Sequence, residues 1–207
     1  MVIMEQDGCN AHARAERRRL RHAVRHGCPR GLDALLRQGC DVNMALSHWR
    51  GHTALTYSAR VGALELVEIL LQTGACEVDR LDRTGCTPLD YAVSAWLTED
   101  NVSRHGRGRR LRVLKRLLSA GACTLSSVTQ QILTRTTNTK HGRLLTEHLC
   151  KIFMKEATAK AKGNLIALLS CGKKTSRNIR LLLSSGAEVS DRLPALLFSQ
   201  TPMQVAR

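Results

Sequence analysis

The chain has 207 residues, with 32 Lys and Arg against 17 Asp and Glu, which gives a formal net charge of +15 at pH 7. Hydrophobic residues make up 43% of the sequence, which is enough to build a core and excludes wholesale disorder. Aromatic residues make up only 3%, so the sequence lacks the strand formers that sandwiches and barrels use, and an α-rich fold is expected.

The cysteines and the apolar runs bear on the cellular compartment. The first twenty residues contain no apolar core of a signal peptide, and runs such as 165–169 are far shorter than the roughly 20 residues that span a bilayer. Eight cysteines are present without a C-x-x-C pair. We therefore expect a cytoplasmic or nuclear protein with free thiols and no membrane span.

Internal repetition is the strongest pattern in the sequence. Two leucines followed closely by a glycine recur in LLRQG, LLQTG, LLSAG and LLSSG, which end at Gly39, Gly74, Gly121 and Gly186. The spacings of 35, 47 and 65 residues fit one unit, one unit with an insertion of about 13 residues, and two units whose shared boundary has diverged. The sequence therefore predicts about five units.

Each unit is predicted to contain two short helices. In the second unit, Thr53 occupies an N-cap position, small and apolar residues follow as far as Arg60, and Gly62 suits a left-handed helix exit. A second apolar stripe begins at Leu64 and ends at Gly74. Because neither helix buries its apolar face alone, stacking of neighbouring units must form the core.

These segments resemble ankyrin repeats. The segment 51–79, GHTALTYSARVGALELVEILLQTGACEVD, resembles a repeat, and DRTGCTPLDYAV from Asp82 resembles the start of the next. Residues 87–89 reproduce the TPL turn of the family, and Asp90 stands where the family usually has His. The resemblance implies an all-α solenoid of about five helix-turn-helix units, one of which carries a basic insertion between its helices.

The resemblance also divides the chain into segments. An N-terminal arm, 1–15, precedes a repeat domain, 16–190, and the segment 191–207 is either a C-terminal cap or a truncated further unit. The insertion is expected to leave the stack as a charged excursion. The expected units are 16–50, 51–83, 84–125 with the insertion at 97–110, a degenerate unit 126–160, and 161–190.

Motifs for catalysis or cofactor binding do not survive inspection. CGKKTS from Cys171 lacks the spacing of a phosphate-binding loop, and HGRGRR from His105 lacks the third glycine of a dinucleotide loop. His22 and His26 lie four residues apart near Cys28, but such a pair is more typical of a helix surface than of a zinc site. We expect no catalytic residue, no cofactor and no metal.

The resemblance places a partner surface on the fingers between units and on the inner helices. Trp49 either anchors a partner or folds back on the first helix pair, and Tyr57 and Tyr91 either form an aromatic ladder or pack partly buried. The predicted partner-binding residues are Met44, His48, Trp49, Arg50, Tyr57, Arg60, Arg80, Leu81, Arg83, Asp90 and Tyr91.

Arginines form two clusters, one near the start of the chain and one in and after the insertion. Each cluster is either a surface for an acidic protein, for nucleic-acid phosphates or for a nuclear import receptor, or a solvated face. The basic residues singled out are Arg17, Arg18, Arg19, Arg21, Arg104, Arg107, Arg109, Arg110 and Arg112.

The sequence as a whole predicts a non-catalytic, monomeric protein-protein interaction module with an acidic protein partner. One alternative is a substrate-recruiting adaptor of a cullin-type ubiquitin ligase, as in ankyrin proteins with a SOCS box; the tail from Leu193 contains LPALL but is too short for a whole box. A second alternative is a nuclear or nucleic-acid-associated regulator that uses its arginine clusters.

Overall fold

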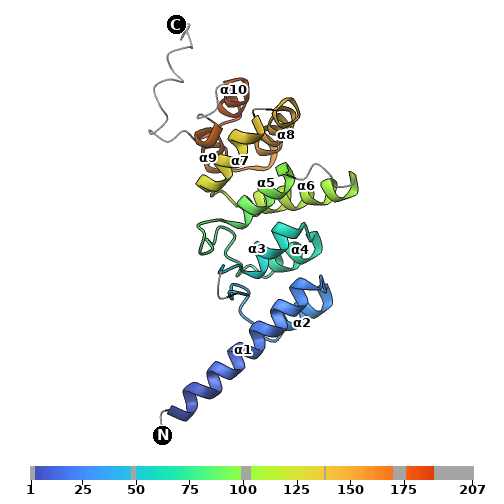
Figure 1. Cartoon of the computed structure of the whole chain (residues 1–207), viewed down its shortest axis with the longest axis vertical. Helices are drawn as coiled ribbons and strands as arrows, with labels where there is room; N and C mark the ends of the chain where they lie inside the picture. The colour runs from blue at the N-terminus through green and yellow to red at the C-terminus, as the bar shows by residue number, and fades with distance from the viewer. Residues whose placement is uncertain (1–2, 48–49, 99–103, 138, 170–175, 189–207) are drawn as a thin grey trace.

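The computed structural model describes residues 3–47, 50–98, 104–137, 139–169 and 176–188 (Figure 1). Within these ranges the chain forms ten α-helices and no strand. The helices are α1 (Ile3–Arg25), α2 (Pro29–Arg37), α3 (Ala54–Val61), α4 (Leu64–Gln72), α5 (Pro88–Thr98), α6 (Arg104–Ser119), α7 (Ser127–Thr137), α8 (Lys140–Glu156), α9 (Ala159–Leu169) and α10 (Ser176–Ser184).

Consecutive helices form five hairpins that stack along the long axis of the molecule (Figure 1). The odd-numbered helices pack on one another as an inner layer, and the even-numbered helices form a second, outer layer. Each substantial contact between described helices joins helices of the same hairpin or of adjacent hairpins. This nearest-neighbour packing confirms the predicted α-solenoid of five helix-turn-helix units.

The ends of the helices in the second unit lie where the sequence predicts them. The Oγ1 atom of Thr53 accepts a hydrogen bond from the Thr56 backbone N–H at 3.2 Å and so caps α3. Gly62, at φ 75°, ends α3, and Gly74, at φ 68°, follows α4. Glycine adopts this left-handed conformation without the steric cost that a side chain brings, so it ends each helix sharply.

The core is a continuous row of leucines contributed by successive units. Leu20, Leu55 and Leu89 of the inner layer have no exposed surface, and each fully buried leucine contributes about 1.5–3 kcal/mol to stability. In the outer layer, Leu70 of α4 and Leu117 of α6 lie 47 residues apart and are both fully buried. The insertion therefore leaves the packing register of the third unit intact.

The described part of the insertion does not leave the stack, contrary to the sequence-based expectation. Helix α5 continues to Thr98, with Trp96 and Leu97 each only 4% exposed, and α6 already begins at Arg104. Arg110 Nη1 donates to the carbonyl of Ala95 at 3.1 Å and ties the two helices together. Because Leu97 of the insertion and the adjacent Trp96 are both large and apolar, lengthening the hairpin buries more apolar surface than an excursion would.

The structure also changes the description of the two chain ends. The predicted arm is helical, because α1 begins at Ile3 and runs without interruption into the first repeat. Arg and Ala, which recur in the segment 12–19, are strong helix formers. The segment 191–207, expected to be a cap or a truncated unit, lies outside the described residues.

Polar side chains join successive units at equivalent positions. Asn43 Nδ2 donates to the Ala75 carbonyl at 2.8 Å, and Asn43 Oδ1 accepts from the Glu77 backbone N–H at 2.9 Å. One unit later, the carboxylate of Asp79 accepts from the backbone N–H groups of Cys123 at 3.1 Å and Thr124 at 3.2 Å. These bonds satisfy backbone groups that loops would otherwise leave unpaired.

Asp90 is a third inter-unit link and does not lie on the partner surface, contrary to the expectation. It is 3% exposed, and its carboxylate accepts from the backbone N–H groups of Thr87 at 2.8 Å and Ser126 at 2.7 Å and from the Thr129 hydroxyl. The side chain thereby pairs donors at the starts of both α5 and α7, where helix N–H groups have no partner within the helix.

The cysteines and the helix lengths bear on two further expectations. Six cysteines, Cys28, Cys40, Cys76, Cys86, Cys123 and Cys150, are free thiols, and Cys40, Cys86 and Cys150 are buried. Burial raises the pKa of the Cys150 thiol to about 12, so this residue is an inert packing group. Among the helices of the described ranges, none combines the length and the apolar character needed to cross a bilayer.

Replacing Asp90 by Ala is expected to lower the free energy of unfolding by about 3 kcal/mol, because it removes the acceptor of several donors at the boundary between the third and fourth units. Urea denaturation followed by circular dichroism measures this loss. The control Asp33→Ala removes an exposed carboxylate, 2.9 Å from Arg37, and is expected to cost less than about 1 kcal/mol. Equal losses in the two variants would contradict the assignment of Asp90.

Candidate functional site

Two loops project between the units and form the predicted fingers. Finger 1 comprises residues 43–52 and finger 2 comprises residues 79–86. The Arg83 backbone N–H donates to the Arg50 carbonyl at 3.0 Å and so joins the fingers directly. The Arg50 and Arg83 side chains are exposed, and Leu81 is 55% exposed. The fingers therefore present cationic and apolar side chains from one connected backbone.

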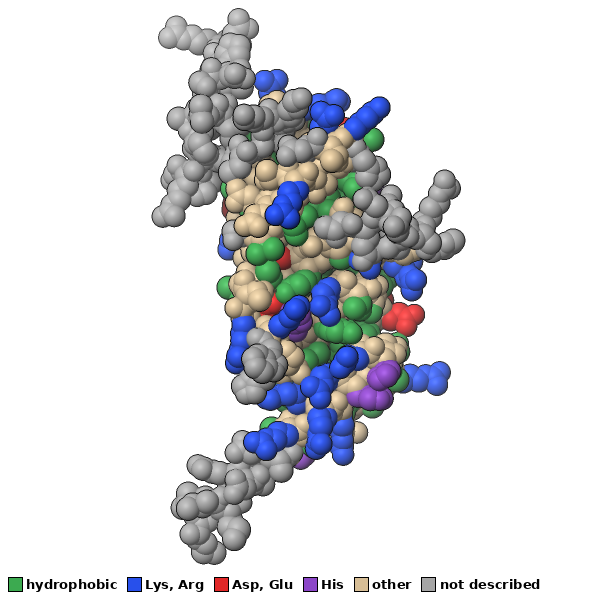
Figure 2. Space-filling view, in the orientation of Figure 1, with side chains coloured by type: hydrophobic (Ala, Val, Ile, Leu, Met, Phe, Trp, Pro, Cys, Tyr) green, Lys and Arg blue, Asp and Glu red, His purple; other side chains and the backbone are tan. Residues whose placement is uncertain are grey.

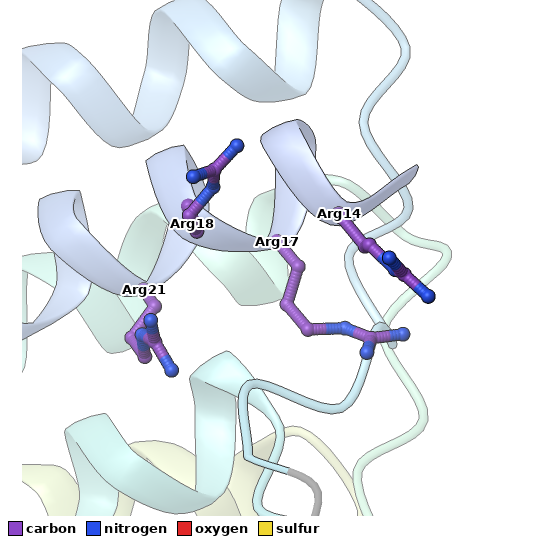
Figure 3. A pocket seen from close by; sticks show the side chains of 4 residues that line it. All are labelled: Arg14, Arg17, Arg18 and Arg21. Atoms are coloured by element: carbon purple, nitrogen blue, oxygen red, sulfur yellow. The ribbon is translucent and has the colours of Figure 1, made fainter. Parts of the chain in front are cut away.

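A row of arginines on α1 continues this cationic character. Arg14, Arg17, Arg18 and Arg21 line a depression of about 480 Å³, and Figure 3 shows Arg14, Arg17 and Arg21 extending to one side of the helix while Arg18 extends to the other. Helix α1 packs against α3, which carries Arg60. We define the arginine surface as Arg14, Arg17, Arg18, Arg21, Arg50 and Arg60.

The arginine surface has little acidic charge to neutralise it. Neither finger 1 nor α3 contains Asp or Glu, and the four arginines on α1 form no ion pair with any described residue. The Nε atom of Arg17 is buried without a hydrogen-bond partner in the described part of the chain. Figure 2 shows Lys and Arg side chains gathered on the lower half of this face, where α1 to α3 lie. Such a surface attracts anionic ligands.

A buried polar cluster lies beside the arginine surface and joins both fingers to α5. His52 Nε2 lies 3.3 Å from Asp82 Oδ2 and 3.1 Å from the Tyr91 hydroxyl oxygen, and the Tyr91 hydroxyl donates to Asp82 Oδ2 at 2.8 Å. The side chains of His52 and Asp82 are 7% and 0% exposed. The cluster fixes the position of the fingers relative to the inner helices.

Burial and hydrogen bonding set the charges in this cluster. Desolvation lowers the pKa of His52, and Arg60 and Arg50 act in the same direction, which together outweigh the attraction of Asp82 for a proton on the ring. Desolvation raises the pKa of Asp82, but hydrogen bonds from Thr84, Cys86 and Tyr91 outweigh it, so that pKa lies below its ordinary value. At neutral pH a neutral imidazole therefore faces a carboxylate.

The two tyrosines of the predicted surface are both half-buried. The guanidinium of Arg60 lies over the ring of Tyr57, 5.2 Å from its centroid, which is a cation–π contact. Tyr91 instead directs its hydroxyl to Asp82, and its ring packs edge-on against His52 with centroids 5.2 Å apart. Tyr91 is therefore engaged within the molecule, while Tyr57 and Arg60 form one ordered pair beside the fingers.

The remaining predicted partner-binding residues are spread along the fingers. Met44 is half-buried against the core. Arg80 is partly neutralised, because its Nη1 atom lies 3.1 Å from Glu77 Oε2. His48 and Trp49 lie outside the described residues, so the two alternatives for Trp49 stay open.

The second basic cluster lies on α6, in the outer layer, apart from the arginine surface on α1 and α3. Arg109 and Arg112 are exposed there, and Arg110 is half-buried through its bond to α5. The side chains of Arg104 and Arg107 lie outside the description. On α1, Arg19 is exposed but is not among the residues that line the depression.

Sequence reasoning identified most of the charged finger residues but missed the pairing of His52 with Asp82. Asp82 is an acidic residue of finger 2, whereas His52 belongs to finger 1, 30 residues earlier. A histidine directly before a helix cap, with an acid in the following finger, is the signal that could have found the pair. Its meaning depends on stacking, which no local pattern shows.

Within the described ranges, no group of three or more His, Cys, Asp and Glu residues is placed to hold a metal ion. His22 and His26 lie close together, with ring centroids 4.3 Å apart, as neighbours one helical turn apart do.

Comparisons with known proteins bear on the fold. The family model described as ankyrin repeats (3 copies) matches residues 20–119. Among solved structures, the chain is similar to the ankyrin repeat domain of human ASB11, with 18% sequence identity, a TM-score of 0.43, and coverage of 88% of this chain and 98% of that chain. No curated protein matches the sequence.

The His52 cluster predicts a pH-dependent stability. Because folding lowers the pKa of His52 below its ordinary 6.5, the unfolded chain takes up that proton first as the pH falls, and the stability present above pH 6.5 is lost as the pH decreases toward the folded-state pKa. Urea denaturation at about pH 7.5 and 5.5 measures the loss. His52→Gln is expected to reduce it, and exposed His26→Gln to leave it unchanged. An unchanged loss in His52→Gln would contradict the assignment.

Proposed function

Since the chain belongs to the ankyrin repeat family through residues 20–119, we propose that it is a non-catalytic module that binds an acidic segment of a partner protein on its arginine surface. Ankyrin repeats are protein-protein interaction modules, and the fold leaves the fingers and inner helices free for a partner. The acidic character of the partner is the part of the proposal that comes from this chain's own residues.

The observation that carries the proposal is that the arginines of the arginine surface form no ion pair with an acid among the described residues. Like charges held close together repel each other, so this arrangement costs stability in the free protein. An acidic partner removes that cost on binding and is drawn to the surface before contact, which raises the association rate. Aspartate and glutamate carboxylates fit the planar guanidinium group through paired hydrogen bonds.

The surroundings of the arginine surface support binding by a preorganised site. The bond between Arg83 and Arg50 and the His52–Asp82 contact hold the fingers in place before a partner arrives. Ordering the fingers in advance reduces the entropy lost on association. Tyr57 beneath Arg60, and exposed Leu81, supply the aromatic, arginine and apolar contacts on which interfaces rely.

Nucleic acid is the competing ligand for the same charges. Proteins that bind single strands stack bases on aromatic side chains, and this chain has only two Trp, two Tyr and two Phe residues in 207. Of the tyrosines, Tyr91 is engaged with Asp82. This scarcity favours a protein partner, and the salt dependence of binding distinguishes the two ligands, since phosphate contacts make affinity fall steeply with salt concentration.

The adaptor hypothesis stays a separate prediction that rests on the segment 191–207, which lies outside the described residues. It requires that elongins and a cullin co-purify with the full chain and are lost when residues 191–207 are removed.

Charge reversal on α1 tests the arginine surface. The double variant Arg18→Glu, Arg21→Glu changes two exposed residues and is expected to reduce the recovery of specific partners by about tenfold in affinity capture with quantitative mass spectrometry. The control Arg135→Glu, Arg180→Glu makes the same charge change at exposed positions of α7 and α10, and this variant is expected to recover the same partners as the unmodified chain.

Two outcomes of this experiment would contradict the proposal. The first is an unchanged set of partners for the α1 variant. The second is loss of all captured material on nuclease treatment, together with an affinity that falls steeply with salt, which would assign the surface to nucleic acid.

A further inference from the structure

A second concave site lies on the outer layer, between α6 and α8. It has a volume of about 410 Å³ and is lined mainly by apolar atoms. Its apolar floor consists of Leu111 of α6 and Ile152 and Met154 of α8; Ile152 is 5% exposed, and the other two are half-buried. This volume lies within the range of about 300–1,000 Å³ that is typical of ligand sites.

Lysines surround this apolar floor. Lys115 of α6 and Lys151 and Lys155 of α8 line the site. Their acidic neighbours neutralise them only in part, because Lys115 Nζ lies 3.9 Å from Glu156, Lys151 Nζ lies 3.4 Å from Glu147, and Lys155 forms no ion pair with any described residue. We call the floor and these three lysines the α6–α8 groove.

The positive charge on α6 contrasts with the charge on the outer helix of the preceding unit. Helix α6 contains seven Lys and Arg residues and no acid. Aligning the units on Gly74 and Gly121, which lie 121 − 74 = 47 residues apart, places Glu65 and Glu68 of α4 at the positions of Arg112 and Lys115 in α6. The outer layer therefore changes from acidic to basic between the second and third units.

The lengthened helix α5 supports one side of this groove. Because α5 extends to Thr98, Trp96 reaches His148 of α8, and the two rings stack with centroids 5.7 Å apart and an interplanar angle of 23°. His148 itself lines the groove. Trp96 is 4% exposed, and its Nε1 atom has no hydrogen-bond partner in the described part of the chain. The stacked pair thus supports the groove from below.

We propose that the α6–α8 groove is a second docking site, independent of the arginine surface, for an acidic amphipathic segment of a partner protein. A large apolar side chain of the segment fills the floor formed by Leu111, Ile152 and Met154. Flanking Asp or Glu residues pair with Lys151 and Lys155. The lengthened helix α5 then has a role, because its Trp96 supports the groove through His148.

Charge and apolarity together favour a protein segment as the occupant. A nucleic acid supplies phosphates for the lysines, but no aromatic ring apart from His148 lines the groove to stack a base. Placing charged phosphates over an apolar floor also costs desolvation without compensating contacts. An amphipathic segment with an apolar face and acidic flanks satisfies both the floor and the lysines, in the manner of a helix in a groove.

Binding of designed peptides to the full chain tests this proposal. The probe is a fluorescein-labelled helix-forming peptide with leucines along one face and Glu and Asp beside them. Two control peptides, the relatives of this probe, differ from it in one property each. In the first, Gln and Asn replace all acidic residues, and in the second, Ala replaces all leucines. Fluorescence anisotropy is expected to show binding of the probe and at least tenfold weaker binding of each relative.

Protein variants locate the binding. Lys151→Glu with Lys155→Glu is expected to weaken binding of the probe at least tenfold, whereas the control Lys160→Glu, which changes an exposed lysine of α9, is expected to retain it. In a Trp49→Phe background, Trp96 is the only tryptophan, and its emission is expected to shift when the probe binds, which also reports that the fold is intact. Arg18→Glu with Arg21→Glu is expected to leave this binding unchanged, so the test is separate from that of the arginine surface.

Several results would overturn the proposal. The first is no detectable binding of the probe at about 1 mM, and the second is that either control peptide binds as tightly as the probe. The third is unchanged affinity in the Lys151→Glu, Lys155→Glu protein while circular dichroism shows a folded chain. The fourth is that a DNA oligonucleotide of matched charge competes as well as the unlabelled probe peptide does.

Discussion

Every part of this molecule depends on the contact between one helix hairpin and the next. A hairpin of two short helices has an apolar face on each side and buries neither by itself. Leu20, Leu55 and Leu89 lose all exposure because successive inner helices cover them. Asn43 and Asp79 supplement this packing by forming hydrogen bonds with backbone groups of the following unit. Both the apolar and the polar contacts that hold the stack therefore join neighbouring units.

The packing between units determines which surfaces are free to bind a partner. The apolar faces are used between units, which leaves the fingers, the outer helix faces and the free side of α1 for contact with other molecules. The arginine surface and the α6–α8 groove occupy two of these regions, on different layers. Hydrogen bonds hold the pKa of Asp82, in finger 2, below its ordinary value, and its buried carboxylate contacts His52 rather than the exposed guanidinium groups.

The sequence predicts what local chemistry determines. Thr53 caps α3 and Gly62 ends it, because a hydroxyl beside a free N–H and a left-handed glycine act within a few residues. Asp90 was misplaced because its hydrogen-bond donors come from two different units. The His52–Asp82 pair and the burial of Trp96 went unpredicted for the same reason, since each depends on which helix lies beside which after stacking.

Native-state hydrogen exchange of the unmodified chain tests the stacking account most directly, because it reports the opening free energy of each helix. If stability comes from neighbouring units, protection is highest in α3 to α8, which have a unit on either side, and lowest in α1 and α10 at the two ends. Uniform protection from α1 to α10 would show that the chain opens as one cooperative globule, and would contradict the account.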